Sequence, residues 1–212
     1  MLRRIALIVL ALGMVLSLSV TPVAAKTETF HFSFKGQFAE AIFSTFDETG
    51  CIETSVYVAG QEGKVKQAGR PAVDSTVVVN ILQFNHCTGE YLLDAFGFET
   101  LAPGDFVIDR KINQATLATT VLVGDFVSGA SFPVDINVSW MGVGETSTTK
   151  DHEKVNEPGF KLNYRFIGTF RLAEASGTVS GMGTNFTPEP AVFAQMGNVS
   201  SGEVQISKDF SS

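Results

Sequence analysis

The sequence predicts a single antiparallel all-β domain, a meander-type β-barrel of eight or more strands, with a β-sandwich as the alternative. Apolar and polar residues alternate with a period of two along most of the chain, which is typical of half-buried strands. Clusters of Gly, Asp, Asn and Thr separate these runs, as turns between antiparallel strands do. After residue 25 the chain contains no convincing run of apolar residues at helical spacing.

The first element is an export signal over residues 1–25. Arg3 and Arg4 precede an apolar run over residues 5–20, and small residues follow, ending at Ala25. This pattern predicts cleavage between Ala25 and Lys26, which leaves a secreted chain over residues 26–212 as one β domain. No later segment is apolar enough to span a bilayer, so we expect no transmembrane segment after the signal is removed.

The strands follow in order along the mature chain. Phe30, Phe32 and Phe34 alternate with polar residues, and Lys35-Gly36 is interpreted as a turn. The clearest strand is the one in which residues 134, 136, 138 and 140 are apolar. The predicted strands span residues 29–34, 37–46, 51–58, 75–85, 91–99, 114–123, 132–143, 159–172 and 175–181, with one or two more after 186.

Glycine in the long predicted strand 159–172 favours a barrel over a sandwich. Gly168 suits the bends that barrel strands require. The segments 168–171 (Gly-Thr-Phe-Arg) and 175–178 (Ala-Ser-Gly-Thr) resemble the glycine-punctuated strand pair of dirigent-like and allene-oxide-cyclase-like barrels. That resemblance implies a barrel and carries over no functional residue.

Reversing direction at each strand places the connections at two ends of the sheet. The connections 47–50, 86–90 and 124–131 are short and fall at one end, here called the short-turn end. Three long connections, residues 59–74, 100–113 and 144–158, fall at the other end, where we expect loops. Long loops on a rigid β scaffold commonly carry binding sites.

The two cysteines, Cys51 and Cys87, both fall at the short-turn end. An even pair in an exported chain predicts a disulfide. Their spacing is far from that of a redox pair, so we expect a structural role.

The charge of the chain excludes some partners. The signal carries two arginines and no acidic residue, so its removal lowers the net charge from −7 to −9. Such a chain repels phosphate backbones, so we expect no nucleic-acid partner. The three long connections are together close to neutral on this acidic background.

Few residues are candidates for chemistry, and no catalytic, phosphate-binding or metal motif is present, so we expect no cofactor and no metal. Asp94 interrupts an apolar strand, where burial would raise its pKa, and the alternative is that it faces solvent or marks a bulge. Asp109 and His152 lie in the long connections and are the other candidates. Sequons are present at Asn137, Asn185 and Asn198.

These observations favour a secreted, non-catalytic domain that binds a small apolar ligand or an extracellular protein or glycan. A secreted enzyme with a site in a barrel mouth is one alternative. A structural protein of the cell surface or matrix, acting through its sheet edges, is the other. An open apolar interior would favour a ligand or a substrate inside it, and a filled one would favour a loop-based interaction site or the structural protein.

Overall fold

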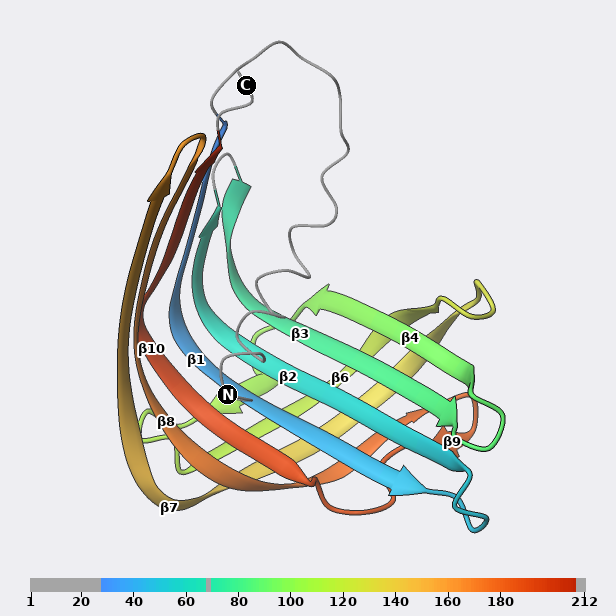
Figure 1. Ribbon diagram of the computed structural model, residues 1–212. Helices are drawn as coiled ribbons and strands as arrows, with labels where there is room; N and C mark the ends of the chain where they lie inside the picture. Colours follow the sequence, from blue (N-terminus) through green and yellow to red (C-terminus); the bar gives the residue numbers. More distant parts are fainter. Residues whose placement is uncertain (1–27, 68–69, 209–212) are drawn as a thin grey trace.

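The computed structural model describes residues 28–67 and 70–208, which form one antiparallel sheet and no helix (Figure 1). The predicted all-β fold is confirmed; the signal and its cleavage site lie outside the described residues. The ten strands are β1 (Glu28–Phe46), β2 (Ile52–Gln67), β3 (Arg70–Asn85), β4 (Glu90–Thr100), β5 (Phe106–Ile108), β6 (Gln114–Asp125), β7 (Ser131–Glu157), β8 (Phe160–Gly181), β9 (Thr184–Asn185) and β10 (Phe193–Lys208).

Eight of the strands are hydrogen-bonded in a ring, which makes the fold barrel-like. The order is β10-β1-β2-β3-β4-β6-β7-β8, and β8 pairs with β10 to complete the circuit. The contact between β4 and β6 is the narrowest, with two residue pairs, Ala95–Asp125 and Phe96–Gly124. The nearly buried Asp125 carboxylate reinforces that contact, because it accepts a hydrogen bond from the backbone N–H of Asp94 at 3.1 Å.

The ring encloses a core of apolar side chains. Alternate residues of each strand point inward, and the largest fully buried ones are Trp140, Phe43, Ile81, Leu117 and Met196. The Trp140 indole N–H donates to the backbone oxygen of Glu40 at 3.0 Å, so the polar atom of the largest core residue is satisfied. Within the described residues the interior of the ring is therefore packed with side chains.

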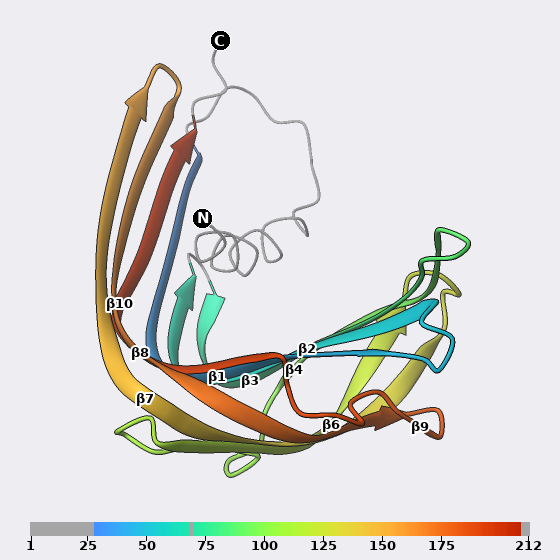
Figure 2. The ribbon, with the colours of Figure 1, turned by 60° about the horizontal axis from the view of Figure 1, so that its bottom comes forward.

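The pairings of six strands continue past the ring and form an open sheet, here called the wing (Figures 1 and 2). The strand β6 begins opposite Met141 of β7, and β4 ends opposite Thr76 of β3, so neither extends into the wing. The order there is β7-β8-β10-β1-β2-β3. The wing consists of residues 28–36, 62–67, 70–75, 147–157, 160–169 and 199–208.

The wing corrects several predicted boundaries. We expected residues 144–158 and 59–74 to be loops, but residues 144–157 belong to β7, and most of 59–74 belongs to β2 and β3. The predicted turn at Lys35-Gly36 is wrong, because both residues lie inside β1, and residues 173–174 likewise lie inside β8. Each of these two false breaks splits one strand in two. Neither changes which of the other connections lie at the same end of the sheet.

Glycines allow the strands to bend where the wing leaves the ring. Gly36 of β1 is paired with Gly63 of β2 on one side and with Val199 of β10 on the other. Val199 is in turn paired with Gly168 of β8. A Cβ on Gly36 would lie 2.2 Å from the backbone oxygen of Glu62, so no other residue fits this close approach of β1 and β2. Figure 2 shows the strands bending where they leave the ring.

Candidate functional site

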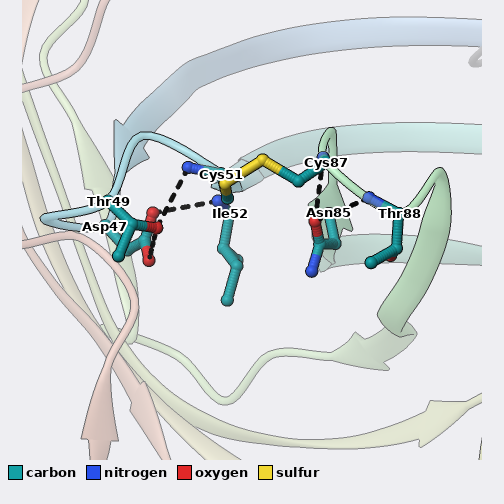
Figure 3. The surroundings of a disulfide bond; sticks show 7 residues. All are labelled: Asp47, Thr49, Cys51, Ile52, Asn85, Cys87 and Thr88. Atoms are coloured by element: carbon teal, nitrogen blue, oxygen red, sulfur yellow. Dashed lines mark hydrogen bonds between the residues drawn. A yellow bond between two sulfur atoms is a disulfide. The ribbon is translucent and has the colours of Figure 1, made fainter.

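The short-turn end of the ring carries the disulfide (Figure 3). Cys51 and Cys87 are bonded, with their Cα atoms 5.4 Å apart, as the sequence predicts. Asp47 Oδ1 accepts a hydrogen bond from the Ile52 N–H at 2.9 Å, and Asn85 Oδ1 accepts one from the Cys87 N–H at 2.9 Å. Each side of the disulfide is therefore held by a side-chain cap on its turn.

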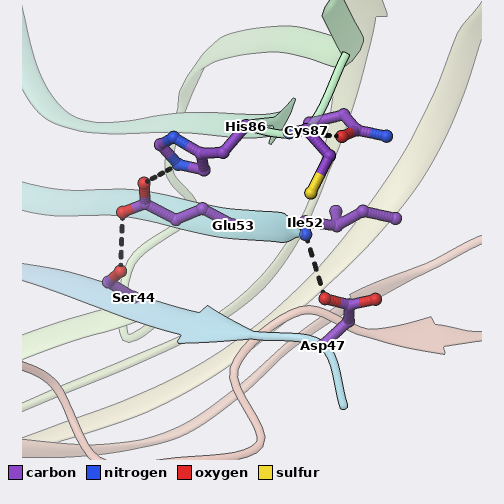
Figure 4. A network of polar contacts seen from close by, with 7 residues as sticks. Ser44, Asp47, Ile52, Glu53, His86 and Cys87 are labelled. Carbon is purple, nitrogen blue, oxygen red and sulfur yellow. Dashed lines mark hydrogen bonds and ion pairs between the residues drawn. The ribbon is translucent and has the colours of Figure 1, made fainter. Parts of the chain in front are cut away.

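A second polar network lies beside the disulfide (Figure 4). His86 Nε2 and Glu53 Oε2 are hydrogen-bonded at 2.9 Å, and the Ser44 hydroxyl donates to the same carboxylate at 2.9 Å. The hydrogen bond from His86, followed by that from Ser44, lowers the pKa of Glu53. The His86 ring also packs edge-on against Phe84, with centroids 4.9 Å apart. These contacts are internal to the turn region and give it a structural role.

The three sequence candidates do not form a common site. Asp94 is half-buried on β4, and its backbone N–H and C=O bond to Asp125 and Phe126. Asp109 caps the turn before β6. Its carboxylate accepts hydrogen bonds from the Asn113 N–H at 3.0 Å and the Lys111 N–H at 2.7 Å, and these bonds, led by that from Asn113, lower its pKa. His152 lies in the wing and is exposed.

The buried carboxylate that the sequence did not reveal is Glu40, on the outer wall of the ring. It is 6 % exposed, and its Oε2 accepts a hydrogen bond from the Tyr57 hydroxyl at 2.8 Å. The Gln195 amide donates to its other oxygen. Burial, and then the charge of Glu40, raise the pKa of Tyr57. Glu40 stands in an apolar run, Phe38 to Ile42, so the reasoning that selected Asp94 could have selected it. Both of its oxygens are satisfied, which indicates a structural role.

The wing has two chemically different faces. Residues directly opposite in an antiparallel pair share a face, so the register assigns each side chain to one of them. One face carries Phe30, Phe32, Phe34, Leu162, Tyr164, Phe166, Val204 and Ile206. The Tyr164 and Phe166 rings stack 6.4 Å apart, and Phe170 continues the row 5.7 Å from Phe166. This face, the aromatic face, forms a small apolar layer of its own.

The opposite face is polar and strongly basic, and is called the basic face. Among the described side chains, its exposed cations are Lys35, Lys64, Lys66, Lys150, Lys154, Lys161 and Arg165, and its carboxylates are Glu62 and Glu203. These seven cations and two carboxylates give the described part of the face a net charge of +5 with the histidines neutral. The sequence gives the three long connections a total charge close to zero. Part of that total comes from side chains that the structure divides between two faces of different charge.

Among the side chains that the structure describes, none of these cations lies within 4.0 Å of a carboxylate. The one such contact among them, between His86 and Glu53, lies in the ring. A hollow of about 480 Å³ lies on the basic face over β7, β8 and β10, and a second one of about 330 Å³ adjoins it. The first is lined by Lys150, Asp151, His152, Lys154, Asn163, Arg165, Ile167 and Glu203. The free charges and both hollows thus share this region of the wing.

Two further observations bear on the kind of site. No group of three or more metal-ligating side chains converges within the described part of the chain. No helix there is long and apolar enough to cross a membrane. Comparison with known proteins adds no relative: no family model, curated protein or solved structure matches this chain.

Proposed function

We propose that this chain is a secreted, non-catalytic binding domain that contacts an extracellular partner through its wing. The export signal in the sequence supports secretion, and a disulfide is compatible with an oxidising compartment. The observation that carries the proposal is the wing itself, an open sheet outside the packed ring with unpaired charges on one face.

The packed interior favours a surface site over an enclosed ligand. Side chains such as Trp140 and Leu117 fill the ring, so a small apolar ligand would have to displace them. The wing, in contrast, exposes cations that no described carboxylate pairs with. A rigid ring with an attached open sheet is suited to presenting such a surface.

Blocking the wing without unfolding the ring tests this proposal. A Cys replaces exposed Asn156 on the basic face and is coupled to a bulky polyethylene glycol; the matched control carries the same group at exposed Glu48 in the turn 47–50. We expect the mature chain to be retained on the surface of the producing cells or in their extracellular material. The conjugate of Asn156→Cys with polyethylene glycol should lose this retention, and the conjugate of Glu48→Cys should keep it. Retention that survives the wing block, or that is lost with the control alone, overturns the proposal.

A further inference from the structure

We propose that the basic face of the wing binds an acidic polysaccharide, a sugar polymer that carries carboxylate or sulfate groups. The proposal rests on the proposed function, because it names the ligand class of the same site.

The arrangement of the charges suits an extended anionic chain. Along β7, Lys150, His152 and Lys154 occupy the same face. Successive side chains on one face of a strand are about 6.7 Å apart. In the row across the sheet, His152 lies opposite Arg165, which lies opposite Glu203. The next strands, about 4.8 Å apart, continue this lattice to Lys35 on β1 and Lys64 on β2. A polymer with regularly spaced anions can therefore contact several cations at once.

The polar groups between the charges suit sugar hydroxyls. The same face presents the side-chain amides of Asn163, Gln205 and Asn156 and the hydroxyls of Ser201, Ser33 and Thr148. Amides and hydroxyls donate and accept hydrogen bonds, as sugar hydroxyls do. Two of these amides, on Asn163 and Gln205, line the hollows, where Lys154 and Arg165 also lie. Cations for the acidic groups and neutral partners for the hydroxyls are thus interleaved.

Other anionic partners fit this face less well. Surface binding to a membrane requires apolar side chains beside the cations, and those of the wing lie on the aromatic face instead. The half-buried Ile167 lines the first hollow. Val155 and Leu162 line the second, and the register assigns both of them to the aromatic face. Single-stranded nucleic acids stack on aromatic rings, and the described side chains of this face include no Phe, Tyr or Trp.

The test compares two charge-reversal variants of the mature chain, residues 26–212. Lys150→Glu with Lys154→Glu changes the basic face, and Arg110→Glu with Lys111→Glu makes the same change in charge in the exposed turn before β6. Binding is measured on immobilised dextran sulfate, polygalacturonate and neutral dextran, and on anionic vesicles and duplex DNA. Melting temperatures verify that both variants fold.

We expect binding to dextran sulfate, polygalacturonate or both, weakening with added salt, and none to neutral dextran. The two acidic polymers distinguish sulfate from carboxylate recognition. Reversing two exposed cations should weaken binding about tenfold, whereas the control should stay within about twofold of the parent.

Three results would overturn the proposal: no binding to either acidic polymer at low salt, equal loss in the two variants, or tighter binding to vesicles or DNA. The wing-blocking experiment separates this failure from that of the proposed function. If retention depends on the wing but neither polymer binds, the ligand class is wrong and the site stands. If retention does not depend on the wing, the site itself is wrong.

Discussion

The same strands carry their apolar side chains on opposite faces in the ring and in the wing. In β1, the inward residues Ala39, Ala41 and Phe43 are buried, while the same face further toward the N-terminus carries Ser33 and Lys35. The phenylalanines of the wing lie on the other face of the strand. In the ring, apolar residues must face the enclosed core. In the wing, the aromatic side chains lie on the opposite face of the strands, and the face that continues from the core is polar.

This exchange of faces shows what each region contributes. The ring is stabilised by a closed core and by a disulfide at its short-turn end. The wing has a single apolar layer, and its two outer strands, β3 and β7, each have one unpaired edge there. Local opening of such a region costs less free energy than unfolding of the core. We therefore expect mutations in the two regions to have different effects.

Truncation of the largest core residue is expected to have the largest effect. Trp140→Ala should lower the free energy of unfolding by about 3–5 kcal/mol, because a fully buried ring and its hydrogen bond are lost. Neighbouring Met141→Ala is the control, since that side chain is 59 % exposed. Urea unfolding measures both. In the wing, Tyr164→Ala should cost clearly less than Trp140→Ala, and equal losses would contradict the division into two regions.

Loss of the disulfide should destabilise the ring by a similar amount. Replacing both Cys51 and Cys87 by Ser should cost about 4 kcal/mol, since the bond closes a loop of 36 residues in the unfolded chain. The melting temperatures of this variant and of the parent are compared under oxidising conditions. The melting temperature of the parent after reduction of the disulfide is the second measurement. An unchanged melting temperature would show that the bond does not constrain the ring.

A substitution at the bend should affect the wing more than the ring. Gly36→Ala places a Cβ against the backbone of Glu62, so one or both strands must shift, at a cost of about 1–3 kcal/mol. Gly124→Ala in β6 is the matched control, because its Cβ would meet nothing closer than 3.9 Å. Hydrogen exchange should show faster exchange in the wing of the Gly36 variant. Normal wing protection in that variant would contradict the role assigned to the bend.

The smallest effect concerns acid stability of the short-turn end. The pKa of Glu53 is lowered in the folded protein, so its contribution to stability is present above the unfolded pKa, near 4.5, and is lost as the pH falls through the folded value. Glu53→Gln should therefore flatten the dependence of stability on pH below about pH 4.5. Glu48→Gln, at an exposed position in the neighbouring turn, is the control. An identical slope in Glu53→Gln and the parent would contradict the assignment that hydrogen bonds from His86 and Ser44 stabilise the Glu53 carboxylate.

The exchange of faces also explains which parts of the fold the sequence could predict. Period-two alternation located the ring strands and placed both cysteines at one end, because inside the ring the pattern keeps one phase. In β1 the apolar positions change from even (Phe34) to odd (Ala39), and in β8 from Phe166 to Ala173. Such a change of phase resembles a break between strands, and it led to the false boundaries at residues 35–36 and 173–174.

The basic face could not be predicted for a related reason. Its cations come from β1, β2, β7 and β8, and only the register brings them to one surface. Residues 144–158 are rich in charge and poor in apolar residues, as loops are, because β7 is an edge strand there. Of the candidate site residues, His152 alone lies on the basic face.

The pattern of amide hydrogen exchange in β7 and β8 tests the central claim most directly. In the wing β8 lies between β7 and β10, whereas β7 pairs with β8 alone. We predict slow exchange for nearly all amides of residues 161–169, and for every second amide of residues 147–157, because only those point toward β8. Uniformly fast exchange throughout 144–158 would identify a loop and contradict the existence of the wing.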